Sequence, residues 1–195
     1  MFTLGMYGDG DFFDMKGVVE EFLDKVGMDK KKDYDPKAGK NFLHPGRQAL
    51  IRYEGEEIGY LGEVHPQVAD NYGIGTRVYV AVLDILQVVK FATYDRKYEG
   101  IARFPAVNRD ISMVVPKDIM VGDIEKMIAQ RGGKILEHYE LFDIYEGDQI
   151  QAGYKSVAYS ITFRSREKTL GEAEVTGAMK KILNGLESMG IQLRK

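Results

Sequence analysis

Two stretches near the end of the chain read as β-strands that place polar side chains on one common face. Successive side chains of a strand point to opposite faces, so the apolar members of residues 156–164 define an inward face: Val157, Tyr159, Ile161 and Phe163. The outward face then holds Ser156, Ala158, Ser160, Thr162 and Arg164. In residues 135–145 the same alternation directs Asp143 and Tyr145 outward. It directs Phe142 and Ile144 inward.

An aromatic ring, hydroxyls, a carboxylate and a cation on one open face suit single-stranded RNA. Such groups stack on unpaired bases, hydrogen-bond to base edges and pair with phosphates. Arg166 and Lys168 extend the cationic group beyond the strand, where such side chains contact phosphates. The open face and the segment beyond it therefore offer these polar groups as candidates for RNA binding: Asp143, Tyr145, Ser156, Ser160, Thr162, Arg164 and Arg166. The same patterns also fit an ordinary solvated sheet face and a solvated loop, since Glu167 lies among the cations.

Catalytic and metal sites find little support in the residue pattern. His44 and His65 each precede a proline, and Glu63 lies near the second of them, but the spacing matches no standard zinc site. A histidine at a turn or strand end with a backbone partner is the better interpretation. The sequence shows neither a nucleophile-elbow motif nor a glycine-rich phosphate loop. We therefore predict no catalytic residue, no metal ligand and no cofactor site in this chain.

The elements after residue 100 follow a regular order. Strands are expected at residues 110–115, 135–145, 156–164 and 191–194. One helix begins near Val121 and stops at Gly132 and Gly133, and a second follows a capping box of Thr169 and Glu172. The order β-α-β-β-α-β is that of a ferredoxin-like α+β fold, whose helices cover one face of an antiparallel sheet and leave the other open.

Residues 1–100 predict a smaller set of helices and strands. A helix is expected after Asp14, closed by Gly27, and the polar residues 29–40 read as a loop. Strands at 49–53 and 58–64 form a hairpin, a short helix starts at Pro66, and Asp84 caps an apolar run after a strand at 78–83. Because residues 94–100 have linker composition, we place domains at 1–97 and 98–195.

Composition limits the partners and the compartment. The formal net charge is −3, which gives no global basic field. Residues 101–195 carry 14 Lys and Arg against 13 Asp and Glu, whereas residues 1–100 carry 13 against 17, so the second half is the better candidate for RNA. The absence of cysteine suits a reducing cytoplasm. No apolar run of membrane-spanning length and no signal peptide occurs, so we expect a cytoplasmic protein without a membrane partner.

Particular strings carry a family resemblance. Residues 103–112 (RFPAVNRDIS), 141–145 (LFDIY), 159–164 (YSITFR) and 169–170 (TL) resemble the ferredoxin-fold anticodon-binding domain that closes bacterial phenylalanyl-tRNA synthetase β chains. Residues 11–17 (DFFDMKG), 44–49 (HPGRQA) and 59–66 (GYLGEVHP) are similar to the end of the same chain's non-catalytic, class II synthetase-like module.

The resemblance implies a partner, a reaction and a set of contacts. Such enzymes are (αβ)₂ heterotetramers that use ATP and Mg²⁺ to charge tRNA(Phe), with the active site in the α subunit, so this chain would be a non-catalytic piece of a longer β subunit. The anticodon stem-loop would meet a tyrosine that stacks on a base, an aspartate, a serine and an arginine, which map onto Tyr145, Asp143, Ser156 and Arg194.

Other functions stay open on the sequence alone. Ferredoxin-like domains also act as small-molecule sensors or protein-interaction modules without RNA binding. Residues 1–100 are alternatively a docking surface for the α subunit.

Overall fold

The computed structural model describes residues 1–28, 31–95, 100–147 and 149–194. The chain separates into two compact units, Met1–Tyr98 and Glu99–Lys195. The predicted domain boundary between residues 97 and 98 lies outside the described residues.

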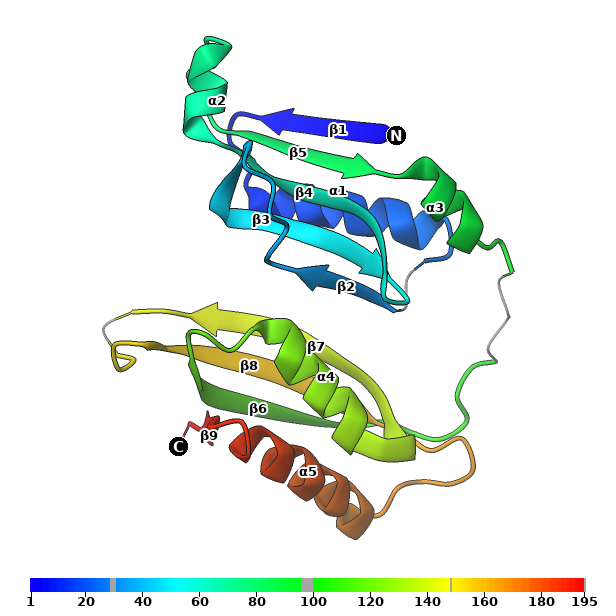
Figure 1. Ribbon diagram of the computed structural model, residues 1–195. Coiled ribbons are helices and arrows are strands. Elements are labelled where there is room, and N and C mark those ends of the chain that lie inside the picture. The colour runs from blue at the N-terminus through cyan, green and yellow to red at the C-terminus, as the bar shows by residue number, and fades with distance from the viewer. Residues whose placement is uncertain (29–30, 96–99, 148, 195) are drawn as a thin grey trace. The chain divides into compact units, whose positions relative to one another are not determined.

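The first unit is built on a five-stranded antiparallel sheet (Figure 1). Its strands are β1 (Phe2–Tyr7), β2 (Lys32–Asp35), β3 (Leu43–Tyr53), β4 (Glu56–Val64) and β5 (Val78–Leu83), in the order β1-β5-β4-β3-β2. The helices are α1 (Phe12–Lys25), α2 (Pro66–Asn71) and α3 (Ile85–Phe91). Met15, Val19 and Leu23 of α1 pack with apolar residues of β3, β4 and β5 to form the core.

Most of the predicted elements of the first unit are confirmed. The hairpin is β3–β4, the short helix at Pro66 is α2, and the Asp84 carboxylate accepts a hydrogen bond from the Leu86 N–H at 3.0 Å to cap α3. The predicted start of the first helix was wrong by one turn. Asp11, not Asp14, is the N-cap, and Asp14 instead accepts the Asp11 N–H at 2.8 Å as the second half of a capping box.

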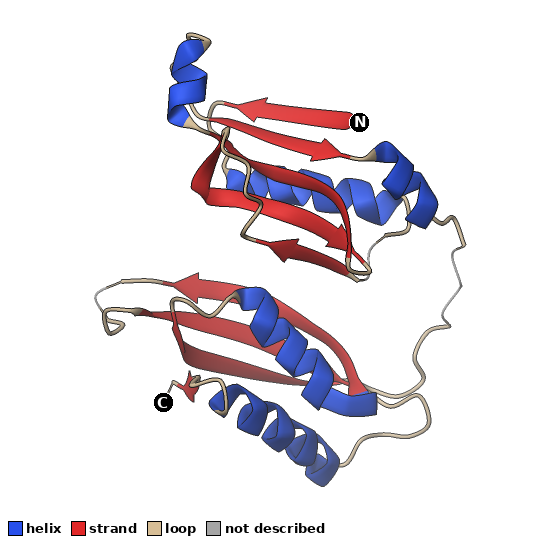
Figure 2. Cartoon of the chain, viewed as in Figure 1, coloured by secondary structure: helices blue, strands red, loops and turns tan. Residues whose placement is uncertain are grey.

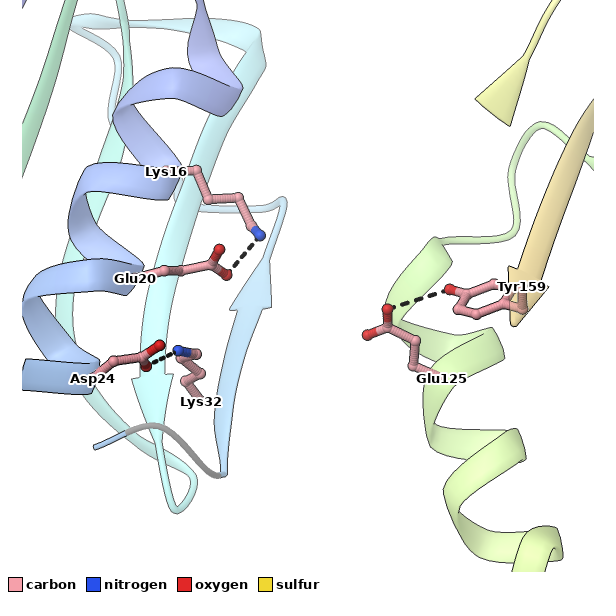
Figure 3. Close-up of polar contacts among 6 residues, drawn as sticks. All are labelled: Lys16, Glu20, Asp24, Lys32, Glu125 and Tyr159. Atoms are coloured by element: carbon pink, nitrogen blue, oxygen red, sulfur yellow. Dashed lines mark hydrogen bonds and ion pairs between the residues drawn. The ribbon is translucent and has the colours of Figure 1, made fainter. Parts of the chain in front are cut away.

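The prediction of a loop over residues 29–40 was also wrong, because residues 32–35 form the edge strand β2. Polar residues hold it: Lys32 pairs with Asp24 of α1 (Figure 3), and Asp35 pairs with Arg52 of β3 at 3.1 Å. Between them Tyr34 packs against the core. The strand that pairs with β2 is β3, which lies further along the chain, so the polar composition of residues 29–40 alone predicted a loop. The strand β1 was not predicted either.

The second unit has the predicted ferredoxin-like order. Its elements are β6 (Val107–Pro116), α4 (Val121–Gly132), a 3-10 turn (Gly133–Ile135), β7 (Leu136–Tyr145), β8 (Tyr154–Phe163), α5 (Glu172–Glu187) and β9 (Gln192–Leu193). The sheet is antiparallel with the order β7-β8-β6-β9, and both helices lie on one side of it (Figure 2).

The helix-facing side of this sheet forms the core of the second unit. As alternation predicted, Val157, Tyr159, Ile161 and Phe163 are buried, and they pack with Ile124 and Ile128 of α4 and Val175, Ile182 and Leu186 of α5. The Tyr159 hydroxyl donates a hydrogen bond to the Glu125 carboxylate at 3.2 Å (Figure 3). Burial, followed by the nearby Glu125, raises the pKa of Tyr159 above its ordinary value of 10.0.

The cap of α5 differs from the prediction. The helix begins at Glu172 after the N-cap Gly171, whose N–H donates to Glu174 at 3.2 Å, so Thr169 and Glu172 do not form the capping box. Instead, the two carboxylate oxygens of Glu172 accept hydrogen bonds from Nη2 of Arg109 in β6, each at 2.7 Å.

A bulge in β7 overturns the inward assignment of Phe142. Leu141 pairs with Tyr159 and Asp143 pairs with Ala158, which leaves Phe142 as an extra residue, 58% exposed. Beyond the bulge Ile144 pairs with Val157 on the helix side, as predicted, although it too is exposed at the edge of the sheet.

Candidate nucleic-acid interface

The side of the β7-β8-β6-β9 sheet that faces away from the helices carries the candidate residues in rows. Directly opposed residues of antiparallel strands point to the same face, so each row can be followed from strand to strand. One row joins Tyr145 of β7, Ser156 of β8, Val114 of β6 and Gln192 of β9. The register therefore places Tyr145 and Ser156 side by side on the open face.

The next row contains Asp143 and leads to Arg194. Asp143 pairs with Ala158, which pairs with Ser112. The Arg194 N–H donates to the Ser112 carbonyl at 2.8 Å, so it extends the β9 ladder by one residue and puts Arg194 in the same row. Three strand spacings separate the two ends, about 14 Å between backbones. Asp143, Tyr145, Ser156 and Arg194 thus occupy two adjacent rows.

The exposures in these two rows differ greatly. Tyr145 is 38% exposed, and Asp143 and Arg194 are also exposed. Ser156 is only 3% exposed, because it sits on a central strand between the larger Tyr145 and Val114. Ser156 and the buried Ala158 therefore lie low on β8, between the exposed side chains of β7 and the half-buried Val114 and Ser112 of β6.

Arg164 lies at the opposite end of β8. It lies eight positions beyond Ser156, which is about 26 Å along an extended strand. Its Nε donates to the Glu137 carboxylate at 2.9 Å, so it is already ion-paired. Arg166 is exposed in the segment between β8 and α5, and Lys168 pairs with Glu174 of α5 at 2.9 Å. The structure does not bring Arg164 and Arg166 together with the other candidates.

The rows between these two ends carry acidic and neutral side chains. Glu140, Ser160 and Asp110 form one row, and His138, Thr162 and Asn108 form the next. The carboxylates of Asp110, Glu140 and Asp143 are all exposed. Because these groups repel phosphates, the open face suits contacts with bases better than contacts with a run of phosphates.

Gln192 belongs to the row of Tyr145 but was not among the predicted residues. Its amide both donates and accepts hydrogen bonds, which suits a base edge. Its register is fixed by the pairing of Val114 with Gln192. The sequence signal for Gln192 was the short strand predicted at the end of the chain. Which residues of that strand face outward could not be assigned until its pairing with β6 was known.

The histidines of the first unit bond to nearby backbone groups and form no metal site among the described residues. Those residues contain no cluster of three or more His, Asp or Glu side chains able to hold a metal ion. His44 Nδ1 accepts the Gly46 N–H at 3.1 Å and His65 Nδ1 accepts the Gln67 N–H at 3.3 Å, which confirms the backbone-partner interpretation of both histidines. Among the same residues no helix is long and apolar enough to cross a membrane.

Comparison with known proteins identifies the family. Residues 102–194 match the ferredoxin-fold anticodon binding domain, and residues 4–85 match the phenylalanyl tRNA synthetase beta chain CLM domain. The phenylalanine–tRNA ligase beta subunit of Clostridium acetobutylicum is 42% identical over 193 residues, which cover 98% of this chain and 24% of the relative. The chain belongs to the phenylalanyl-tRNA synthetase β-chain family.

Other bacterial members of the phenylalanyl-tRNA synthetase β-chain family give the same picture. The beta subunit of Bacillus subtilis is 40% identical over 177 residues, which cover 91% of this chain and 22% of the relative. That of Symbiobacterium thermophilum is 36% identical over 184 residues, covering 94% and 20%. The chain therefore spans about a quarter of the length of the relatives it matches, or less.

Proposed function

We propose that this chain is a tRNA-binding part of a phenylalanine–tRNA ligase β subunit, and that it contacts the anticodon stem-loop of tRNA(Phe). The open face of the β7-β8-β6-β9 sheet is the contact surface. The observation that carries the proposal is the placement of the exposed Tyr145 in the row next to Asp143 and Arg194, within a unit that matches an anticodon binding domain.

Each exposed residue has a role that follows from its chemistry. The Tyr145 ring stacks on an unpaired base, and the Asp143 carboxylate accepts hydrogen bonds from base N–H groups. Arg194, at the far end of the Asp143 row, contacts a phosphate or a base edge. The role of Ser156 differs from the hydrogen-bonding role first expected. Because its side chain is only 3% exposed, Ser156 forms part of the surface beneath a bound base, and the base reaches its hydroxyl only at close approach.

The phosphate contacts predicted for Arg164 and Arg166 stay a prediction. Contact with RNA there requires a stem that extends about 26 Å from the Tyr145 row. It also requires Arg164 to exchange its ion pair with Glu137 for a phosphate. We therefore assign these arginines a smaller contribution to binding than Arg194.

The rest of the enzyme supplies the chemistry. We propose that the α subunit activates phenylalanine with ATP and Mg²⁺ and transfers it to the tRNA in an (αβ)₂ enzyme of the cytoplasm. Residues 1–97 are proposed to be the end of a class II synthetase-like module that supports the interface with α, and residues 98–195 the anticodon-binding domain. Among the described residues, no cluster of His, Asp or Glu side chains is able to hold a metal ion.

Titration of the chain with a tRNA(Phe) anticodon stem-loop tests the proposal, at one stated salt concentration. The control RNA has the same stem and a scrambled loop. We expect the cognate loop to bind more tightly, and Tyr145→Ala to weaken that binding by about 1–3 kcal/mol, the usual contribution of one base stacked on an aromatic ring.

A matched variant separates stacking from a general loss of aromatic surface. Tyr72 follows α2 in the first unit and is 79% exposed, so Tyr72→Ala removes an exposed ring that does not belong to the proposed face. It should bind the stem-loop like the parent chain. Equal binding of both RNAs, or equal effects of the two substitutions, would show that the site assignment is wrong.

A further inference from the structure

The tip of the Tyr145 ring lies against the backbone of Gly147, two residues further along the chain. A methyl group built at Gly147 would be 2.6 Å from Tyr145 Cζ and 3.2 Å from Cε1, and closer still to the hydroxyl oxygen. Carbon atoms without a bond between them approach to about 3.5–4.0 Å. The ring thus occupies the space that any larger side chain at position 147 would need.

The backbone of Gly147 gives no separate reason for a glycine. Eight glycines of the described residues have a positive φ, and Gly147 is not one of them. Its conformation is therefore accessible to an alanine, and the three atoms nearest to the added methyl group all belong to the Tyr145 side chain. By contrast, a methyl group at Gly177, which lies within α5, would meet no atom within 4 Å.

This contact restricts the ring of an exposed tyrosine at the end of an edge strand. Such a side chain ordinarily samples three staggered χ1 positions. Fixing one of them before the RNA arrives reduces the entropy lost on binding and so strengthens binding. In the observed position the ring keeps 38% of its surface exposed, so a base can still stack on it.

We propose that Gly147 is a positioning residue, which holds the Tyr145 ring in the orientation that stacks on an anticodon-loop base. The inference rests on the proposed function of Tyr145. Because the obstructed atoms are the far end of a surface side chain, Gly147→Ala moves the ring to another rotamer and leaves the sheet intact. Gly147 itself makes no contact with the base.

Four variants of the chain, titrated with the tRNA(Phe) anticodon stem-loop, test the role. They are Gly147→Ala, Tyr145→Ala, the double variant, and Gly177→Ala as the matched glycine control. We expect Gly147→Ala to bind about tenfold more weakly than the parent, a fraction of what one stacked base contributes. Gly177→Ala should bind like the parent, and Gly147→Ala should add no loss to Tyr145→Ala.

A second measurement needs no RNA. Nuclear Overhauser contacts between the Tyr145 ring protons and the Gly147 α-protons should be present in the parent chain and retained in Gly177→Ala. Circular dichroism of Gly147→Ala should match that of the parent. Absence of the ring contact in the parent overturns the inference whatever the affinities are.

The outcomes separate the inference from the function on which it rests. If Tyr145→Ala weakens binding and Gly147→Ala does not, the positioning role is wrong and the proposed function stands. A further loss when Gly147→Ala is added to Tyr145→Ala means that Gly147 does not act through the ring, which also overturns the inference. If Tyr145→Ala binds like the parent, the proposed role of Tyr145 fails and the inference fails with it.

Discussion

Arg109 of β6 holds Glu172, the first residue of α5, with its Nη2 atom 2.7 Å from each of the two carboxylate oxygens. Arg109 pairs with the buried Ile161, so its side chain is on the helix side of the sheet. A cation within the string that resembles an anticodon-binding domain thus joins strand to helix and does not belong to the open face.

The first prediction follows from this placement. Arg109→Ala should lower the free energy of unfolding of the second unit by roughly 0.5 kcal/mol, the usual range for a partly exposed ion pair. It should leave the affinity for the anticodon stem-loop unchanged. Urea denaturation and the RNA titration together check it, and a loss of RNA affinity with unchanged stability would contradict the assignment of Arg109 to the helix side.

The second prediction concerns alkaline pH and the hydrogen bond between Tyr159 and Glu125. The folded pKa of Tyr159 is raised above 10.0, chiefly by burial, so its contribution to stability is fully present below about pH 10. As pH rises above that value, the unfolded chain loses the proton while the folded chain keeps it, and the free energy of unfolding falls with a slope that approaches about 1.4 kcal/mol per pH unit.

Tyr159→Phe tests this linkage directly. The substitution removes one hydrogen bond and should cost about 1 kcal/mol at pH 7. It should also make the fall in stability between pH 10 and pH 11 shallower, since the phenyl ring has no proton to release. Urea titrations of both chains at pH 7, 10 and 11 give the comparison. The same slope in both would mean that Tyr159 is not the titrating group.

The third prediction compares two arginines of the second unit. Arg194→Ala should weaken stem-loop binding, and if Arg194 contacts a phosphate it should reduce the slope of log K against log salt by about 0.7, the value for one single-strand phosphate. Arg164→Ala should have a smaller effect on affinity, because Arg164 is paired with Glu137 and lies far from the Tyr145 row. Titrations at four salt concentrations measure both, and a larger effect at Arg164 would relocate the interface.

The fourth prediction is a stabilising substitution. Gly177 is exposed within α5 and a methyl group there would meet nothing within 4 Å. Gly177→Ala should raise the free energy of unfolding of the second unit by about 0.5–1 kcal/mol, because glycine loses more backbone entropy than alanine in a helix. Thermal unfolding checks it. A lower midpoint of thermal unfolding would contradict the prediction, because it would mean that the space beside Gly177 does not accommodate a methyl group.

The sequence was sufficient where one local pattern determined the structure. Alternation in residues 156–164 assigned both faces of β8, since Val157 to Phe163 contain an apolar residue at every second position. The assignment of Asp143 and Tyr145 to the open face also agrees with the pairing in the sheet. The assignment of Phe142 failed because a bulge depends on the register between two strands, which no single strand encodes.

Other errors had the same origin in distant partners. Residues 32–35 form a strand because their backbone pairs with residues 50–53 of β3, a partner that the segment's own composition does not reveal. The burial of Ser156 follows from Tyr145 and Val114 on the flanking strands, so its alternation gave the correct face and the wrong accessibility. The row that contains Gln192 and the contact between Gly147 and Tyr145 could not be predicted either, because both depend on the three-dimensional structure.

Amide chemical-shift mapping shows residue by residue whether the open face of the β7-β8-β6-β9 sheet receives the anticodon loop. The uniformly ¹⁵N-labelled chain is titrated with the tRNA(Phe) anticodon stem-loop at one salt concentration. We expect no response from the outer faces of α4 and α5, and the largest shifts at Asp143, Tyr145, Ser156, Gln192 and Arg194. Shifts concentrated on those helices or on the first unit would contradict this expectation.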